Sequence, residues 1–470
     1  MPLAAQIERI RTKLPLARKA DPAHLVFGSN AHRYELGPTL TEAQVFRVEI
    51  LNQISLPVCY HAFLLDIGNG GSDLRRPGAG PFYGLCTLKA SVELANPINL
   101  ARPCLLSPDM TPSDWKQLKE SQGDDLEADA TTKQHCAWDR SLNGVLPIGA
   151  QARSAHHGLI LNGPHTGRIV NLSDGLERPK FAYEATFLDW YERWLDEVMA
   201  RYLQHWDGYK FGYLRAGDDI ALMNAFDQAE APADRIEFLA ALSKLKKIET
   251  QTLDRLETLA SAPNVEVQRQ AIEQLARFDF KCVASHLAEL ISSDDEGLSL
   301  ACRLIIYHGK ERASDYVDKI ARRPAEITDS DTFSMIAGVM HAARADWSDM
   351  LRNYCESPDI SIRKMAFTCL GQHPTAVKAR NIDRFMMGLS DDAPRVVHAT
   401  LQAVAGLEDP RLHPSFESIL ERFSTDEEFI LTNLDHRLRE HGFANRNQFL
   451  DARRKLERQA AKRPDSAAAF

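Results

Sequence analysis

Long apolar runs are missing from this sequence. No stretch reaches the 18 consecutive apolar residues that a membrane-spanning helix needs. Residues 1–19 place Ile7, Ile10 and Leu14 at helical spacing among charged side chains, so they lack the apolar core and the cleavage site of a signal peptide. We expect no membrane segment, and a chain retained in the cytoplasm unless a secretion route that ignores signal peptides exports it.

Closely spaced cysteines are missing too. The sequence has eight cysteines, and no two of them form a Cys-x-x-Cys pair. Metal and redox motifs need closer spacing, so we expect buried or half-buried free thiols, no metal and no other cofactor. The eight are Cys59, Cys86, Cys104, Cys136, Cys282, Cys302, Cys355 and Cys369.

Signatures of the common catalytic classes are also absent. The sequence has no P-loop, nucleophile elbow, zincin motif or kinase set, and its glycine-rich stretch does not follow a strand as a dinucleotide fingerprint does. His156 and His157 are adjacent rather than at ligand spacing on a helix, which favours a turn or the surface. We expect a protein that is not an enzyme; a hydrolase of unfamiliar type is the enzymatic alternative.

The chain lacks the excess of basic residues that nucleic-acid binding needs. The formal net charge is −9, and residues 211–436 carry 25 Lys and Arg against 37 Asp and Glu. Phosphate backbones are bound by basic surface, so we expect no direct nucleic-acid binding. The acidic stretch suits a basic protein partner such as a nuclease, or it is only solvated surface.

Short apolar runs punctuated by glycine and proline fill the first 200 residues. Residues 158–161 and 168–170 have the pattern of strands, and Asn162-Gly163-Pro164 between them predicts a hairpin or meander. Residues 111–135 are polar and acidic and predict a solvated loop with a short helix. Its candidate partner contacts are Asp124, Asp125 and Asp129.

An aromatic helix follows. Thr186 and Asp189 have the spacing of a capping box, which predicts a helix beginning at Phe187. A stripe of aromatic residues then favours a helix that faces a core and closes a domain, and ligand stacking is the alternative. The stripe is Phe187, Trp190, Tyr191, Trp194, Leu195, Val198 and Tyr202.

Beyond Pro232 strand-like runs end and similar helical segments recur. Copies begin at Asn264, Asp359 and Asp392, and weaker ones surround Leu300 and Met335. Their spacing of about 30–35 residues is the period of a two-helix repeat, which buries its apolar face only by stacking. The segment resembles HEAT-type repeats, and predicts an all-α array.

The basic tail is the last segment. Its arginines could bind nucleic acid or acidic lipid, but it lacks interleaved aromatic residues. Four apolar residues have the spacing of docking positions, so we expect a cap on the array: Phe443, Phe449, Leu450 and Leu456. The predicted division of the chain is 1–206, a connecting segment 207–232, repeats 233–435, and a cap and tail 436–470.

The glycine-rich run carries the most specific pattern. Residues 56–71 and 80–85, with the lead-in 27–38 before them and 144–168 and 187–195 after them, resemble the SUKH superfamily over about residues 20–205. The residues of the motif are Gly68, Asn69, Gly70, Gly71, Gly80, Pro81, Tyr83, Gly84, Trp190 and Trp194.

This resemblance implies an α+β domain with a twisted, mainly antiparallel sheet flanked by helices, and no catalytic residues. Bacterial members of the superfamily are commonly immunity proteins that bind and block toxin domains of polymorphic toxin systems, and fungal relatives regulate cell-wall synthesis through protein partners. We therefore expect an immunity protein for a cognate toxin. The alternative is an intracellular scaffold or regulator that uses both parts of the chain without a toxin.

Two departures from the superfamily's pattern stand out. Residues 72–78 interrupt the glycine-rich run with a charged insertion, and residues 169–171 lack an expected tryptophan. Loops on rigid scaffolds usually carry specificity, so the insertion is a candidate contact, or it is ordinary variation. Its candidate residues are Asp73, Arg75 and Arg76.

The buried position expected for Trp194 leads to a first prediction. Trp194→Ala should lower the unfolding free energy of the N-terminal domain by about 3–5 kcal/mol, the usual cost of truncating a buried aromatic side chain. Urea unfolding followed by circular dichroism measures it. A loss below about 1 kcal/mol would mean that Trp194 is exposed, and would favour the stacking alternative.

Overall fold

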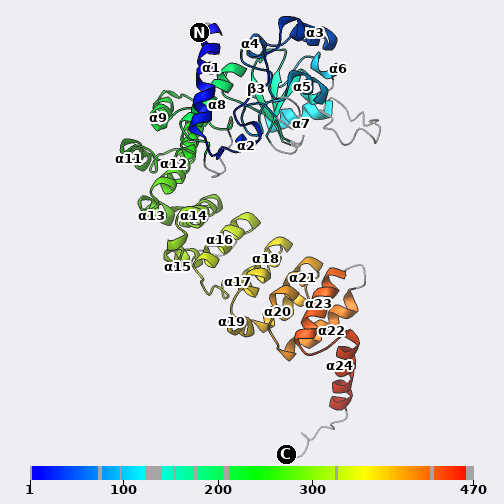
Figure 1. The fold of residues 1–470 in the computed structure, drawn as a ribbon. Coiled ribbons are helices and arrows are strands. Elements are labelled where there is room, and N and C mark those ends of the chain that lie inside the picture. Colours follow the sequence, from blue (N-terminus) through cyan, green and yellow to red (C-terminus); the bar gives the residue numbers. More distant parts are fainter. Residues whose placement is uncertain are drawn as a thin grey trace, which may run out of the picture. The chain divides into compact units, whose positions relative to one another are not determined.

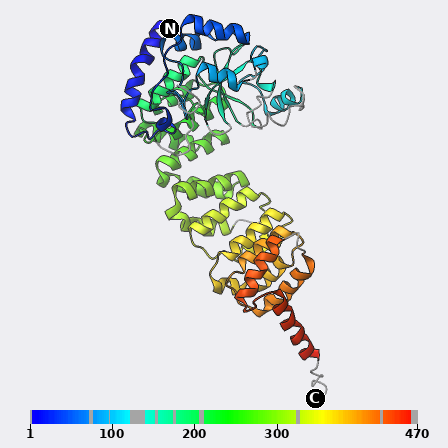
Figure 2. The same cartoon turned by 45° about the vertical axis from the view of Figure 1, so that its right-hand side comes forward.

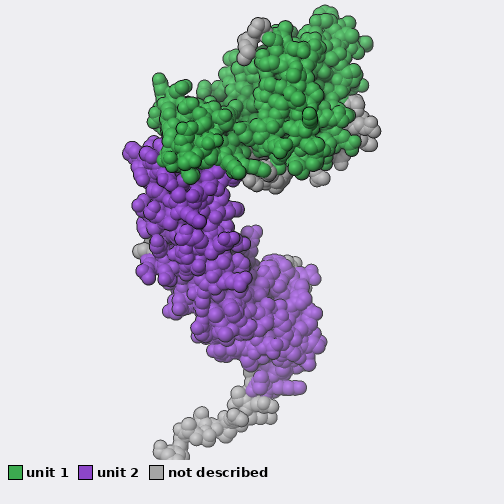
Figure 3. All heavy atoms as spheres, turned by 60° about the vertical axis from the view of Figure 1, so that its left-hand side comes forward, with its two compact units in different colours: residues 1–255 green, residues 256–470 purple. Residues whose placement is uncertain are grey.

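The computed structural model describes residues 3–71, 77–95, 97–121, 140–151, 155–173, 177–204, 211–322, 327–423 and 428–461. Most of these residues are helical, and one small sheet lies among them (Figure 1). The chain divides into two compact units, residues 1–255 and residues 256–470 (Figure 3). In the ranges described, no helix is both long and apolar enough to cross a membrane.

The sheet of the first unit is an antiparallel meander. Its strands are β1 (Val145–Ala150), β2 (His156–Ile160), β3 (Ile169–Leu172) and β4 (Lys180–Phe181), hydrogen-bonded in that order. The predicted hairpin and the mainly antiparallel sheet are confirmed. The turn or surface position predicted for His156 and His157 is wrong, because both lie in β2 and the His157 side chain is fully buried.

Helices precede and follow this sheet along the chain. Before it come α1 (Leu3–Ala20), α2 (Ser29–His32), α3 (Glu42–Asn52), α4 (Val58–Asp66), α5 (Leu88–Leu94), α6 (Pro97–Leu100), α7 (Pro112–Ser121) and η1 (Arg140–Leu142). After it come α8 (Phe187–Met199), α9 (Asp219–Gln228), α10 (Pro232–Ala241) and η2 (Leu242–Lys244), and then α11 (Thr250–Leu259).

The two faces of the sheet bury different cores. Alternate residues of a strand point to opposite faces, so Leu146 and Leu159 pack with α1, α4 and α8. Val145 and Ile160 face the other way, toward Trp115 of α7. The larger core thus lies between the sheet and the aromatic helix α8.

The predicted aromatic helix is confirmed as a core element. The Thr186 hydroxyl accepts a hydrogen bond from the Asp189 amide at 3.2 Å and donates to its carboxylate at 2.7 Å, which begins α8 where expected. Trp190 and Trp194 are both fully buried. The stripe is therefore used for packing over Phe187–Val198. Tyr202 does not belong to it, because α8 ends at Met199 and Tyr202 is only half-buried.

A buried ion cluster joins α8 to the end of the first unit. Lys244 of η2 is fully buried, and its ammonium donates to the Glu197 carboxylate at 3.1 Å and to the Arg215 carbonyl at 2.7 Å. The Arg193 guanidinium lies between Glu197, at 3.1 Å, and Glu184, at 2.5 Å. Burial lowers the pKa of Lys244, and the nearby Glu197 carboxylate opposes that shift. Each buried charge thus has a partner of opposite sign.

Helical pairs fill the second unit. Its elements after α11 are α12 (Val265–Phe278), η3 (Phe280–Val283), α13 (Ala284–Ser292), α14 (Asp295–His308), η4 (Lys310–Tyr316), α15 (Val317–Ala321), α16 (Ser330–Ala342), α17 (Leu351–Cys355), α18 (Ile360–Gly371), α19 (Thr375–Arg380), α20 (Ile382–Leu389), α21 (Pro394–Ala403), η5 (Pro410–Leu412), α22 (His413–Arg422), α23 (Glu428–Glu440) and α24 (Arg446–Ala461).

The second helices of these pairs stack on one another. Helices α12, α14, α16, α18, α21 and α23 each pack on the next, and their first residues are 30 to 35 positions apart (Figures 1 and 2). Asn264, Asp294, Asp329 and Asp359 cap four of them by accepting backbone amide hydrogen bonds. The predicted all-α array with a two-helix period is confirmed.

Ion pairs link successive pairs of helices. Arg269 of α12 contacts Asp294, the N-cap of α14. The Arg363 guanidinium of α18 donates two hydrogen bonds, of 2.8 and 3.1 Å, to the carboxylate of Asp391, just before α21. At the end of the array Phe449 is fully buried, as expected of a cap. Leu456 is exposed, so its predicted docking position is wrong.

The boundary predicted at 207–232 remains a prediction, and the ion cluster sharpens its test. Expressed alone, residues 1–255 should unfold cooperatively. Residues 1–206 should be less stable, because Glu197 and Arg193 lose the Lys244 ammonium and the carbonyl of Leu214. Urea midpoints of the two fragments measure the difference, and equal midpoints would contradict this role for the cluster.

A single substitution in the full chain isolates the same contact. Lys244→Met should cost about 3 kcal/mol, because it leaves a buried carboxylate short of a partner. Lys247→Met is the matched control, and this exposed lysine should change stability by less than about 0.5 kcal/mol.

Candidate functional site

Glycine allows stretches of backbone in the first unit to pack directly on one another. A Cβ on Gly28 would lie 1.9 Å from the Phe82 carbonyl oxygen. Gly70 has a φ of +53°, and its Cβ would lie 2.1 Å from the Cys86 carbonyl oxygen. A Cβ on Gly78 would meet the Gly70 carbonyl carbon at 2.1 Å. No side chain fits at these contacts, so packing requires glycine at Gly28, Gly70 and Gly78.

Hydrogen bonds attach this region to the sheet. We call residues 68–71 together with 78–84 the glycine cradle. Gly78 and Leu85 exchange two backbone hydrogen bonds of 2.8 Å, and the Cys86 amide donates to the Ile148 carbonyl of β1 at 2.8 Å. The cradle is therefore an extension of the sheet edge, held in a fixed position.

Residues 21–37, which include most of the lead-in, cross the cradle around a buried carboxylate. Asp21 is fully buried and accepts hydrogen bonds from the amides of Leu25 and Val26 and from two hydroxyls, of Ser29 and Tyr34. These four donors satisfy the hydrogen-bonding needs of the buried carboxylate. The buried Asp21 carboxylate thereby stabilises the turn of this segment.

The same segment is held in an unusual backbone conformation. Arg33 and Tyr34 have φ values of +50° and +58°, in the left-handed region that side chains rarely adopt. The Tyr34 ring stacks on Trp194 of α8, with centroids 5.8 Å apart, and His32 meets the same ring edge-on. Burial lowers the pKa of His32 to about 4, so this imidazole is neutral at pH 7.

A cleft of about 490 Å³ lies where the lead-in meets the cradle, and we call it the cradle cleft. Asn30, Arg33 and Glu35 line it from the lead-in, Gly71 lines it from the cradle, and Pro77 lines it from the charged insertion. Gly71 directly precedes that insertion in the sequence.

The structure describes some of the predicted site residues and not others. The motif residues Gly68, Asn69, Gly70, Gly71, Gly80, Pro81, Tyr83 and Gly84 come together in the cradle, and Trp190 and Trp194 lie in the core behind it. The predicted partner contacts Asp73, Arg75, Arg76, Asp124, Asp125 and Asp129 all lie outside the described residues. Asn30, Arg33 and Glu35 belong to the lead-in of the resemblance but were not predicted to line a site, since the left-handed turn at Arg33 and Tyr34 involves no glycine.

The described residues near the cleft offer charge and hydrogen bonds rather than activated groups. Burial raises the pKa of the Cys86 thiol to about 11 and also raises that of Cys59, so both are protonated at pH 7. Among the residues described, no group of three His, Cys, Asp or Glu side chains could hold a metal ion. The cleft is chemically suited to recognising polar groups of another molecule.

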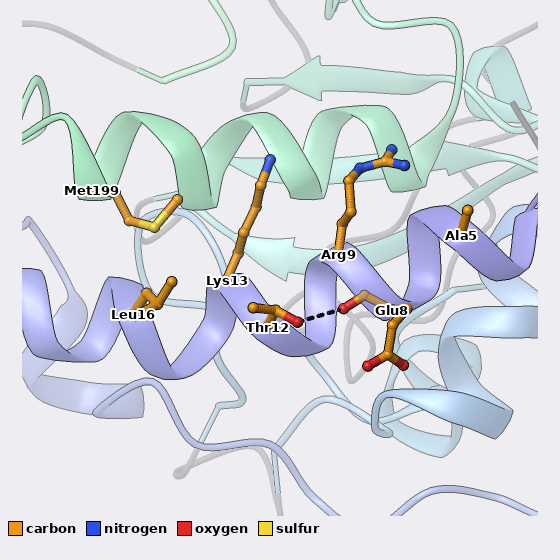
Figure 4. Close-up of a pocket in the computed structure, with 7 residues that line it drawn as sticks. All are labelled: Ala5, Glu8, Arg9, Thr12, Lys13, Leu16 and Met199. Carbon is orange, nitrogen blue, oxygen red and sulfur yellow. Dashed lines mark hydrogen bonds between the residues drawn. The ribbon is translucent and has the colours of Figure 1, made fainter.

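A second hollow, of about 550 Å³, lies along α1 and ends at Met199 (Figure 4). Its cationic side chains, Arg9 and Lys13, are already paired with Glu192 of α8, at 2.7 and 2.9 Å. These partners help hold the pKa of Glu192 at about 2 despite its burial. The charges of this hollow are used to fasten α1 to α8, so the cradle cleft is the better candidate site.

Comparison with protein-family models and with curated proteins finds no significant match to this chain.

The cradle leads to a prediction about two glycines of the first unit. Gly70→Ala should destabilise this unit by more than about 3 kcal/mol, because it combines a left-handed φ with a backbone clash. Gly212→Ala is the matched control: its φ is +85°, but the new Cβ meets nothing closer than 3.6 Å, so the cost should be about 1 kcal/mol. Urea unfolding compares them, and similar losses would contradict the packing role of the cradle.

Proposed function

We propose that this chain is a protein-binding protein without catalytic activity, and that it neutralises a cognate bacterial toxin as an immunity protein. Its first part would be a domain of the SUKH superfamily, and its second part a HEAT-type array. It would act in the cytoplasm, bind the toxin domain directly, and need neither a cofactor, nucleic acid nor a membrane.

The cradle cleft is the observation that carries this proposal. Gly71, which precedes the charged insertion of residues 72–78, and Pro77 within that insertion line a cleft whose walls are held by backbone packing, by the buried Asp21 carboxylate and by α8. Recognition loops mounted on rigid scaffolds are the usual carriers of binding specificity. The arrangement suits contact with another protein better than conversion of a substrate.

The array supports the same proposal through its charge. Residues 211–436 have a formal charge of −12, and arrays of stacked helical pairs offer long surfaces for partners. An acidic surface would steer a basic toxin such as a nuclease, and would speed its capture. The alternative function is an intracellular scaffold or regulator, and the same surface and repeats would serve it without a toxin.

Co-expression is the direct test. The toxin domain encoded beside this gene should kill cells, and the full-length chain should protect them and be recovered in a stable complex. Association should weaken as salt rises, because exposed charges are screened within about 8–10 Å at ordinary ionic strength. Unchanged killing, with no complex recovered at low salt, would reject the immunity function and leave the scaffold.

A triple variant tests the insertion. Replacing Asp73, Arg75 and Arg76 with alanine should reduce affinity for the toxin at least tenfold without changing the unfolding midpoint. Replacing Lys89, Glu93 and Lys116 of α5 and α7 is the control with the same charges, and it should leave affinity unchanged. If the two variants bind the toxin equally well, the interface does not include the insertion.

A further inference from the structure

A cavity of about 290 Å³ lies in the array between the ends of two successive second helices. Helix α16 lines it near its last residues, and α18 contributes Cys369 and the turn that follows. Two apolar side chains of the wall, Met340 and Trp347, are buried in the array. The wall therefore offers a compact apolar body a place to bind.

Polar side chains complete the wall, and each of them can donate a hydrogen bond. His341 and Arg344 follow Met340 along the chain, and Gln372 and His373 follow α18. Of the ten described residues that line the cavity, none is Asp or Glu. In an array with an excess of acidic residues, this cavity is lined by side chains that can donate hydrogen bonds, and one of them is the cationic Arg344.

An acidic side chain close to His373 already has partners in the protein. One carboxylate oxygen of Asp346 accepts from the Ser348 hydroxyl at 2.7 Å, and the other pairs with Arg380 at 2.7 Å. Burial lowers the pKa of His373, and the Asp346 carboxylate opposes that shift.

Two further observations concern the hydrogen-bonding groups around the cavity. Nε2 of His373 is buried without a hydrogen-bond partner among the described residues, and buried polar atoms of that kind are rare. The carbonyls at the end of α16 are capped, since Met340 and Val339 accept from the amides of Ala345 and Ala343. Their partial negative charge is thus largely satisfied by the turn itself.

We propose that this cavity binds an organic carboxylate: the apolar body would rest on Met340 and Trp347, and the carboxylate would be held by Arg344 and His373. Arginine binds carboxylates through two parallel N–H donors, and a neutral imidazole can add a third. The volume suits a ligand of one aromatic ring. This inference does not depend on the proposed immunity function.

Benzoate is the probe, and it should bind the full-length chain with a dissociation constant on the order of 1 mM, as expected for a ligand of this size. Ligand-observed NMR would compare it with benzylamine, which carries the opposite charge, and with benzyl alcohol, which carries none. Benzoate should bind at least tenfold more tightly than either. Equal binding of all three, or tighter binding of the amine, would overturn the proposal.

Substitutions locate the binding. Arg344 has a φ of +52°, so Arg344→Asn removes the charge and keeps a residue that tolerates this conformation. It should weaken benzoate binding at least fivefold, as should His373→Gln. Arg395→Gln removes an exposed arginine outside the cavity and is the control. Unchanged affinity in both cavity variants, with unchanged unfolding midpoints, would also overturn the proposal.

One further probe separates two sources of the carboxylate. Acetyl-Gly-Phe with a free carboxylate presents the C-terminal residue of a protein, and benzoate presents a free acid. If the dipeptide binds more tightly than benzoate, the ligand is a chain terminus; if benzoate binds more tightly, it is a small molecule. Both results support a carboxylate site, whereas tighter binding of the amidated dipeptide would reject it.

Discussion

The nearly complete burial of helix α8 is the constraint on which the first unit depends. Ten of its thirteen residues are buried, and they include three charged side chains, Glu192, Arg193 and Glu197. A buried charge is costly unless it is paired, so each of these side chains requires a partner brought from another segment. The position of α8 thereby determines which segments surround it.

The partners of these three charged side chains come from three other parts of the sequence. Arg9 and Lys13 of α1 pair with Glu192, Glu184 pairs with Arg193, and Lys244 pairs with Glu197. On its apolar side the Tyr191 hydroxyl donates to the Ala79 carbonyl of the glycine cradle at 3.0 Å. Helix α8 thus holds the glycine cradle, which borders the cradle cleft. The same helix also binds α1 and Lys244, which lie near the two ends of the first unit.

Local patterns predicted most of the elements, because their causes lie within a few residues. The cap at Thr186, the aromatic stripe and the 30–35-residue period each reflect neighbours along one helix or one pair of helices. Contacts between distant segments were not predictable. Lys244 had no visible partner in the sequence, and neither the burial of His157 nor the left-handed turn at Arg33 follows from its neighbours. The glycine motif was found by its resemblance to a family, whereas its reason, backbone packed on backbone, appears only in three dimensions.

Hydrogen exchange of the full chain, with and without the toxin domain encoded beside it, tests the central claim most directly. If the cradle cleft is the binding surface, amides of residues 30–37 and 77–85 should exchange at least tenfold more slowly in the complex. Amides in the buried core of α8 should be unchanged. A stable complex in which those two segments exchange at the rate of the free chain would contradict the account, and would move the interface away from the cleft.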